Sequence, residues 1–422
     1  MRNSWFVTSI GVYMLTQTEN WRPSLDRFQR LALIVGVVGA IVCGIGAALG
    51  PAQFFHSLMF AFFFWMTLTI GASIVLMIQH LTSGVWGLML RRMLEAALMA
   101  MPVLLVVFLI LIIGMGDNYS WMDPAKVAES KVLQFKSVWL NQPFYIVRGL
   151  LYFAAWIGIG YVLNRWSSDQ DRTGDPKIVN RLATLSGPGI PIFVLLFTLA
   201  ATDWGMSLEP EWFSSMYPVT FIIEGLLAAM AWGVLALSIM RSRKLLPYNV
   251  PVDRLHDLGK FMFAFTILWT YINFSQFLII WSGNIPEETT WYGHRLEHGW
   301  DVLAVTLMIG HFFIPLFGLI SRHPKRNFTT MTIAAIYIIA IQIVFVFWSV
   351  TPAFFPEAFH IHLLDLATLI TVGAFWLSLW ARNLKQRPLL PPNDHRMPQL
   401  ERQVANEAHG HSHSEPKAKT AH

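Results

Sequence analysis

Charge is scarce in this chain of 422 residues: 13% are Asp, Glu, Lys or Arg, whereas 55% are hydrophobic. So few charges could not cover the surface of a water-soluble protein, and most of that surface must therefore face lipid. The apolar runs are too long for the strands of a membrane β-barrel, whose residues alternate between lipid and lumen. The sequence predicts an all-α polytopic membrane protein.

Cysteine is almost absent. Because Cys43 stands alone, neither an internal disulfide nor a cysteine-ligated iron–sulfur cluster can form within the chain. Nucleotide-binding motifs and Cys/His spacings typical of metal sites are missing as well. A transmembrane haem would need paired histidines at one depth, and His311 has no evident deep partner. We expect no metal and no cofactor bound by this chain, and the net charge of +5 reflects loops rather than a nucleic-acid surface.

Ten apolar stretches approach or exceed the roughly 20 residues that a helix needs to cross a bilayer. Bounded by charge, Pro or Gly, they cover residues 31–49, 54–79, 93–114, 144–163, 189–202, 219–239, 261–281, 299–320, 330–350 and 361–380. The fifth is short, and we expect its helix to continue into the stretch around Asp203. The chain then divides into an N-terminal segment (1–30), a membrane domain (31–380) and a tail (381–422).

The tail is Pro-rich and then polar, and it ends in HGHSHSEPKAKTAH. This composition is typical of a disordered, solvated segment, and metal binding by its histidines is the alternative.

The basic residues of the loops predict the orientation. The segment before span 1 and the loops after the even-numbered spans carry 25 Lys and Arg, whereas the loops after the odd-numbered spans carry 4. Cytoplasmic loops hold the positive excess. Both termini are therefore expected in the cytoplasm, and the loop after span 5 on the outer side.

Ionisable side chains inside a bilayer cost about 3 kcal/mol or more unless they are paired or hydrated, and they commonly mark function. The stretch TDWGMSLEPEWF (202–213) sets three acids in a region with no Lys or Arg between Arg181 and Arg241. The proton-relay candidates of the chain are Glu224, Glu95, His311, Asp203, Glu209, Asp365, His56 and Arg148, with Asn273 and Gln276 as supporting amides.

By depth, these residues resemble two half-channels: acids toward the outer side, amides and His311 near the middle, and Glu95 toward the inner side. Bland interpretations stand beside this one. Residues near span ends could occupy the headgroup region: His56, Asp203 and Asp365. Glu209 could be a loop residue and His311 a hydrogen-bonded core histidine. Glu224 could pair with Arg148, and Glu95 with Arg91 or Arg92.

Three runs carry a family resemblance: DWGMSLEPEWFS (203–214), FSQFLIIWSGNIPEETTWY (274–292), and FFHSLMFAFFFW (54–65) followed by HLTSGVWGLMLRRMLE (80–95). Over about residues 30–385 the chain resembles the ActF family of NrfD-like (polysulfide-reductase-like) membrane subunits of bacterial alternative complex III. The resemblance implies two four-helix bundles, spans 2–5 and 6–9, flanked by spans 1 and 10.

The resemblance also implies a place in a respiratory or photosynthetic quinol:electron acceptor oxidoreductase of the bacterial cytoplasmic membrane. Its partners would be the NrfD-like sister subunit (ActC), the iron–sulfur subunit (ActB), c-type cytochromes (ActA and ActE) and small membrane subunits. Haem c and iron–sulfur clusters would lie in those partners, and quinol or menaquinol binding by this chain is left open. The expected role is structural, with proton conduction through buried Glu, Asp and His as the hypothesis. The alternatives are a quinone-binding catalytic subunit, anchored by His56, Arg148 and Asp203, and an independent proton-coupled transporter.

Overall fold

The computed structural model describes residues 21–246 and 250–412, so predictions for residues 1–20 and 413–422 lie outside it. The described residues form helices and contain no strand, which confirms the predicted all-α fold. The helices are α2 (Arg22–Leu49), α3 (Pro51–Thr82), η2 (Val85–Gly87), α4 (Leu88–Leu98), α5 (Met101–Ile113), α6 (Met115–Asn118), η3 (Ser120–Met122), α7 (Pro124–Glu129), α8 (Lys131–Lys136), α9 (Gln142–Thr173), α10 (Lys177–Trp204), η4 (Met206–Leu208), α11 (Met216–Ser242), α12 (Val252–Gly283), α13 (Pro286–Leu296), α14 (Trp300–Leu307), η5 (Met308–Phe313), α15 (Ile314–Ile320), α16 (Arg322–Lys325), α17 (Phe328–Val350), η6 (Thr351–Ala353), α18 (Leu363–Leu384) and α19 (Met397–Ser412).

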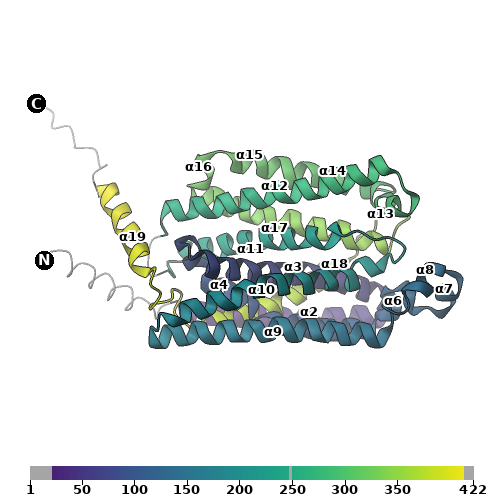
Figure 1. Ribbon diagram of the computed structural model, residues 1–422, viewed down its shortest axis with the longest axis horizontal. Helices are drawn as coiled ribbons and strands as arrows, with labels where there is room; N and C mark the ends of the chain where they lie inside the picture. The colour runs from purple at the N-terminus through teal and green to yellow at the C-terminus, as the bar shows by residue number, and fades with distance from the viewer. Residues whose placement is uncertain (1–20, 247–249, 413–422) are drawn as a thin grey trace, which may run out of the picture.

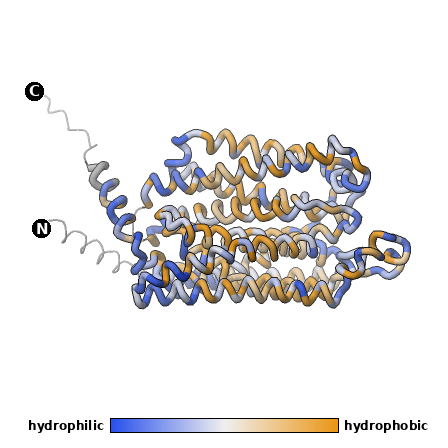
Figure 2. Tube along the Cα trace, in the orientation of Figure 1, coloured by the Kyte–Doolittle hydropathy of each residue, from blue (hydrophilic) through white to orange (hydrophobic). Residues whose placement is uncertain are grey.

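Within the described residues, ten helical segments are long and apolar enough to cross a membrane, as predicted. They run side by side along the long axis of the molecule (Figure 1). Apolar residues dominate along the bundle and hydrophilic residues gather at its two ends (Figure 2). The chain is therefore a membrane protein.

Helix packing confirms the expected architecture. The first bundle comprises α3, α4–α5, α9 and α10, and the second comprises α11, α12, α14–α15 and α17. Outside them, α2 packs on α18, and α18 packs on α3. The helices α4, α16 and α19 lie at one end, here called the basic end, and α6–α8 and α13 lie at the opposite end (Figure 1).

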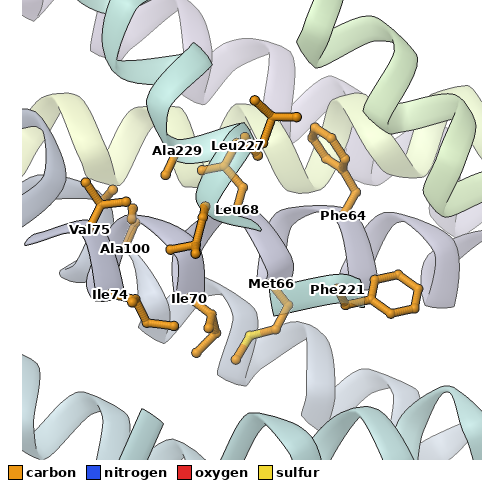
Figure 3. Packing of buried hydrophobic residues seen from close by; sticks show 14 of the residues in the cluster. Phe64, Met66, Leu68, Ile70, Ile74, Val75, Ala100, Phe221, Leu227 and Ala229 are labelled. Carbon is orange, nitrogen blue, oxygen red and sulfur yellow. The ribbon is translucent and has the colours of Figure 1, made fainter. Parts of the chain in front are cut away.

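The two bundles meet where α3 crosses α11. A Cβ on Gly71 would stand 1.8 Å from the carbonyl oxygen of Gly225, so only glycine permits this approach. Small residues let membrane helices pack backbone to backbone in this way. Near the contact, the rings of Phe63 in α3 and Phe221 in α11 pack with centroids 5.4 Å apart, and further buried apolar side chains of the two helices surround them (Figure 3). In the most apolar stretches of α3 and α11, 89% and 83% of the residues are buried, so the contact between the two helices is shielded from lipid.

Several helices extend beyond their predicted spans. The fifth begins at Lys177 rather than near residue 189, because Pro188 and Pro191 lie inside the helix instead of starting it. It does continue to Trp204, as expected. The first begins at Arg22 rather than residue 31, since Leu25 is buried and Asp26 pairs with Lys385.

The tail also differs from its description as a disordered segment from residue 381. Leu389, Leu390 and Leu400 are buried, and α19 follows from Met397. Asp394 lies among arginines at the basic end, so ion pairs fold this part of the tail back against the bundle. Composition could not predict that this part of the tail packs against the bundle, because only a few of its residues are apolar and buried. Residues 413–422, which include the end of the His-containing tract, lie outside the described part.

Candidate functional site

Glu224 and His311 meet in the second bundle. Nε2 of His311 lies 3.2 Å from Oε2 of Glu224 and forms a hydrogen bond of 3.5 Å with Oε1, whereas Oε2 has no hydrogen-bond partner in the described part of the chain; both side chains are 1% exposed. Glu224 is the ninth residue of α11, about 12 Å along the helix from its first residue. His311 lies in a π-helical turn between α14 and α15, a distortion that is frequent at functional sites. Two relay candidates from separate spans are therefore one pair.

Apolar and amide groups surround this pair. Among the described residues, Glu224 forms no ion pair with Lys or Arg. The Trp269 ring stacks on the His311 ring with centroids 3.6 Å apart, and the Gln342 amide donates to the backbone oxygen of Glu224 over 3.1 Å. Nδ1 of His311 has no protein hydrogen-bond partner. The pair can thus hold a proton between carboxylate and imidazole, with a second ring nitrogen free to accept or donate.

A small polar cavity lies on the side of the pair toward the opposite end. Asn273 and Gln276 line it together with Thr220 and Ser349, and it has room for about one water molecule. The hydroxyls of Thr220 and Ser349 are buried without protein partners. Thr220 precedes Glu224 by one helical turn. Asn273 and Gln276, the two amides predicted as supporting groups, thus line a cavity near Glu224, and their part in a relay stays a prediction.

Asp203 occupies a different, fully satisfied site. Its carboxylate accepts from Arg148 Nε and Nη2, from the Tyr152 hydroxyl and from Trp139 Nε1, each over 2.8 Å. The Arg148 guanidinium lies 4.1 Å from the centroids of the Trp139 and Phe144 rings. The alternative that Arg148 pairs with Glu224 is wrong, because Nε and Nη2 of Arg148 donate to Asp203 and Nη1 donates to the Trp139 carbonyl. The Arg148–Asp203 pair therefore joins α9 to α10 within the first bundle.

Glu209 binds two basic side chains of α13. It accepts from Arg295 over 2.7 Å and contacts Nδ1 of His294 at 2.6 Å. Burial alone would raise the pKa of Glu209, but the charge of Arg295 and the hydrogen bond from His294 outweigh it and lower that pKa. Arg295 is itself buried over the Trp291 ring, 3.9 Å from its centroid. The acids of residues 203–209 thus tie one short stretch to an arginine in each bundle.

Asp365 and His56 lie where α3 and α18 begin. Asp365 accepts from the Ser57 hydroxyl over 2.5 Å and from the backbone N–H of His362 over 2.8 Å, which makes a capping box for α18. Nε2 of His56 lies 3.1 Å from the Asp117 carbonyl, and its ring stacks on Phe354. Both residues fasten helix ends to loops, and neither contacts the Glu224–His311 pair.

Glu95 lies at the basic end, among arginines. Its carboxylate meets Arg91 at 2.9 Å, Arg92 at 2.6 Å and Arg387 at 3.4 Å, and it accepts from the Ser167 hydroxyl over 2.6 Å. The pairing of Glu95 with Arg91 and Arg92 was one of the two alternatives drawn from the sequence, and it is the one observed.

The same cluster contains residues that the sequence analysis did not select. Asp394 pairs with Arg91 at 2.9 Å and with Arg396 at 2.7 Å, and the bond from Arg396 outweighs burial to bring the pKa of Asp394 down to about 2. Asp171 pairs with Arg92. Two missed residues elsewhere could have been selected from the sequence. Gln342 is an isolated amide in the apolar run 330–350, and Arg295 is the single Lys or Arg of its loop.

In the part of the chain that the structure describes, no group of three or more His, Cys, Asp and Glu is placed to hold a metal ion. The sequence matches no protein-family model and no curated protein. The site residues lie in separate clusters, and in the Glu224–His311 pair an imidazole faces the carboxylate, to which no Lys or Arg of the described residues is paired.

Proposed function

We propose that this chain is an integral membrane subunit of a quinol:electron acceptor oxidoreductase of the alternative complex III type. In this proposal it provides structure and carries protons through Glu224 and His311. The sequence resemblance over residues 30–385 supports the first part. The observation that carries the second is a buried carboxylate and imidazole 3.2 Å apart, with no Lys or Arg of the described residues paired to the carboxylate.

In the proposed assembly the redox centres lie in other subunits. Haem c and iron–sulfur clusters belong to partner subunits, and the complex lies in a bacterial cytoplasmic membrane. The basic end faces the cytoplasm, in keeping with the excess of Lys and Arg in the loops there. Residues 203–213 then lie on the outer side.

The proposed chemistry is the sharing of one proton. When Glu224 is protonated, its hydroxyl donates to Nε2 of His311. When the proton passes to His311, the imidazolium is paired with the carboxylate, and a proton on Nδ1 can leave. The cavity lined by Thr220 and Ser349, whose hydroxyl groups can orient water, lies one helical turn from Glu224, and in this proposal protons reach the pair from it. Glu95 has no such freedom, because three arginines hold its carboxylate.

Proton release by the reconstituted complex tests this proposal. In Glu224→Gln, the amide keeps the shape of the side chain but cannot take up or release a proton at neutral pH. We expect quinol oxidation to persist when the gradient is collapsed and proton release per electron to fall. Glu297→Gln is the matched control, because the Glu297 side chain is 69% exposed. Normal assembly with unchanged proton release in Glu224→Gln would contradict the relay.

Membership of the complex is tested separately. The chain should co-purify with subunits that carry haem and iron–sulfur clusters. Isolation of a stable, active protein without them would favour the proton-coupled transporter. A catalytic quinone site at Arg148 and Asp203 finds less support, because those two side chains already satisfy each other.

A further inference from the structure

A second cavity, outside the proposed relay, lies at the basic end, where the ends of α4, α9 and α18 approach one another. It encloses about 50 Å³. Its polar lining comprises Arg92, Glu95, Asn164, Asn383, Gln386 and Arg387. Ala96, Met99 and Leu384 form its apolar part. The cavity is therefore amphipathic.

Hydrogen-bond donors are in surplus around this cavity. Nε of Arg92 and Nδ2 of Asn383 are buried and have no protein partner. The Arg92 side chain is 2% exposed, and its other two nitrogens already bond to Glu95, Ser167 and Asp171. Arg387 makes a single ion pair, at 3.4 Å. Buried donors without acceptors are costly, so the lining is suited to a group rich in acceptor oxygens.

The acceptors present in the cluster are already in use. Oε1 of Glu95 accepts from Arg91 and Ser167, and Oε2 accepts from Arg92. The described cluster holds four arginines (Arg91, Arg92, Arg387 and Arg396) against three carboxylates (Glu95, Asp171 and Asp394). One positive charge is left over, and Arg387 carries it at the cavity. An anion would neutralise it.

The apolar part of the lining points to a lipid source. Met99 is partly exposed at the cavity, and Tyr161, one helical turn before the lining residue Asn164, is 54% exposed on a membrane-spanning helix. Basic pockets between membrane helices commonly bind acidic lipid headgroups. We propose that this cavity binds a phosphate group, supplied by the headgroup of an anionic phospholipid.

Lipid retention by the purified full chain, together with any subunits that co-purify, tests the proposal. The protein is washed in detergent and titrated with phosphatidylglycerol, with phosphatidylcholine or with inorganic phosphate. Bound lipid is counted by native mass spectrometry, and thermal unfolding is followed in parallel. The variants are Arg387→Gln, which removes the excess charge, and Asn383→Leu, which removes a free donor and no ion pair. Arg382→Gln is the control: its side chain is exposed, and it does not line the cavity.

We expect phosphatidylglycerol to be retained and to raise the melting temperature, and phosphatidylcholine to do so less. Arg387→Gln should weaken retention about fivefold, the effect of one basic residue near a lipid surface. Asn383→Leu should weaken it as well, whereas Arg382→Gln should not. Protection by inorganic phosphate with the same variant pattern, without lipid retention, would support the phosphate site and overturn the lipid source.

Equal loss in Arg382→Gln and Arg387→Gln would overturn the proposal, because general surface charge would then explain the binding. So would the absence of both lipid retention and phosphate protection. Unfolding without added ligand is measured for every variant, so that a loss of fold is distinguished from a loss of binding.

Discussion

Glu95 and Glu224 are both carboxylates buried within membrane helices, yet their surroundings differ in charge. Their side chains are 3% and 1% exposed. Glu95 lies within 3.4 Å of three arginine side chains and accepts from Ser167. Glu224 has one imidazole at 3.2 Å. The sequence analysis placed both in one proton relay.

The difference shows that two similarly buried carboxylates can have partners of different chemistry. Arginine remains charged at every physiological pH, so a carboxylate surrounded by arginines stays ionised and acts as a structural tie. Histidine can gain or lose its proton near neutral pH, so a carboxylate paired with histidine alone can exchange one. The partner of the carboxylate distinguishes the two roles.

The largest effect that this comparison predicts is on stability. Glu95→Gln removes the counter-charge of buried Arg91 and Arg92, and breaking such a network costs about 3–5 kcal/mol. Glu224→Gln leaves a neutral amide that can still bond to His311, so it should cost much less. Thermal unfolding of the two variants in the same detergent measures the difference. Similar melting temperatures for both would remove the distinction between the two sites.

The second effect concerns Asp203 and Arg148, which resemble the Glu95 site in having a permanent charge as partner. Asp203→Asn and Arg148→Gln each leave a buried charge unpaired, whereas the double variant leaves no unpaired charge. A double-mutant cycle should therefore give a coupling energy of about 2–3 kcal/mol. Denaturant or thermal unfolding of the four proteins provides it. If the losses of unfolding free energy in the two single variants simply add in the double variant, the charge of Arg148 is not what holds Asp203, and the likeness to the Glu95 site fails.

The third effect tests the helix seam beside Glu224. Gly71→Ala would force a methyl group against the carbonyl of Gly225, and we expect a loss of about 1–3 kcal/mol. Because Gly225 directly follows Glu224, proton release should fall in this variant, while the Glu95 cluster should be unaffected. Gly158→Ala is the control, since a Cβ there meets nothing within 4 Å. Stability equal to that control would show that the close approach does not govern the seam.

The smallest effect, absent at neutral pH, is the response of the ion pairs to acid. The pKa of Asp394 is lowered from 3.8 to about 2 in the folded protein. Its contribution to stability is therefore complete above the unfolded value of 3.8, and it is lost as the pH falls toward 2. Asp394 should therefore cause no difference between the melting temperatures at pH 7 and pH 5, and the melting temperature should fall below pH 4. In Asp394→Asn the acid-dependent part of this loss should be smaller. An equal response to acid in that variant would exclude Asp394 as its source.

Much of the fold could be predicted from the sequence, because each apolar run long enough to span a bilayer must form a helix whose backbone groups bond internally. The local pairing of Glu95 with Arg91 and Arg92 was also accessible, since residues three and four apart share a helix face. The limits of α10 were not, because Pro188 and Pro191 resemble a boundary and are tolerated within the helix.

The sequence by itself predicted ten membrane-spanning helices, which the described residues contain, and which polar residues those helices carry. Only the tertiary structure decided the partners that lie on other helices. Arg148 and Asp203 are 55 residues apart in the chain, and Glu224 and His311 are 87 apart. Asp394 meets Arg91 across 303 residues. Helix periodicity fixes neighbours within a turn, whereas contacts between helices depend on which faces pack together, as at Gly71 and Gly225.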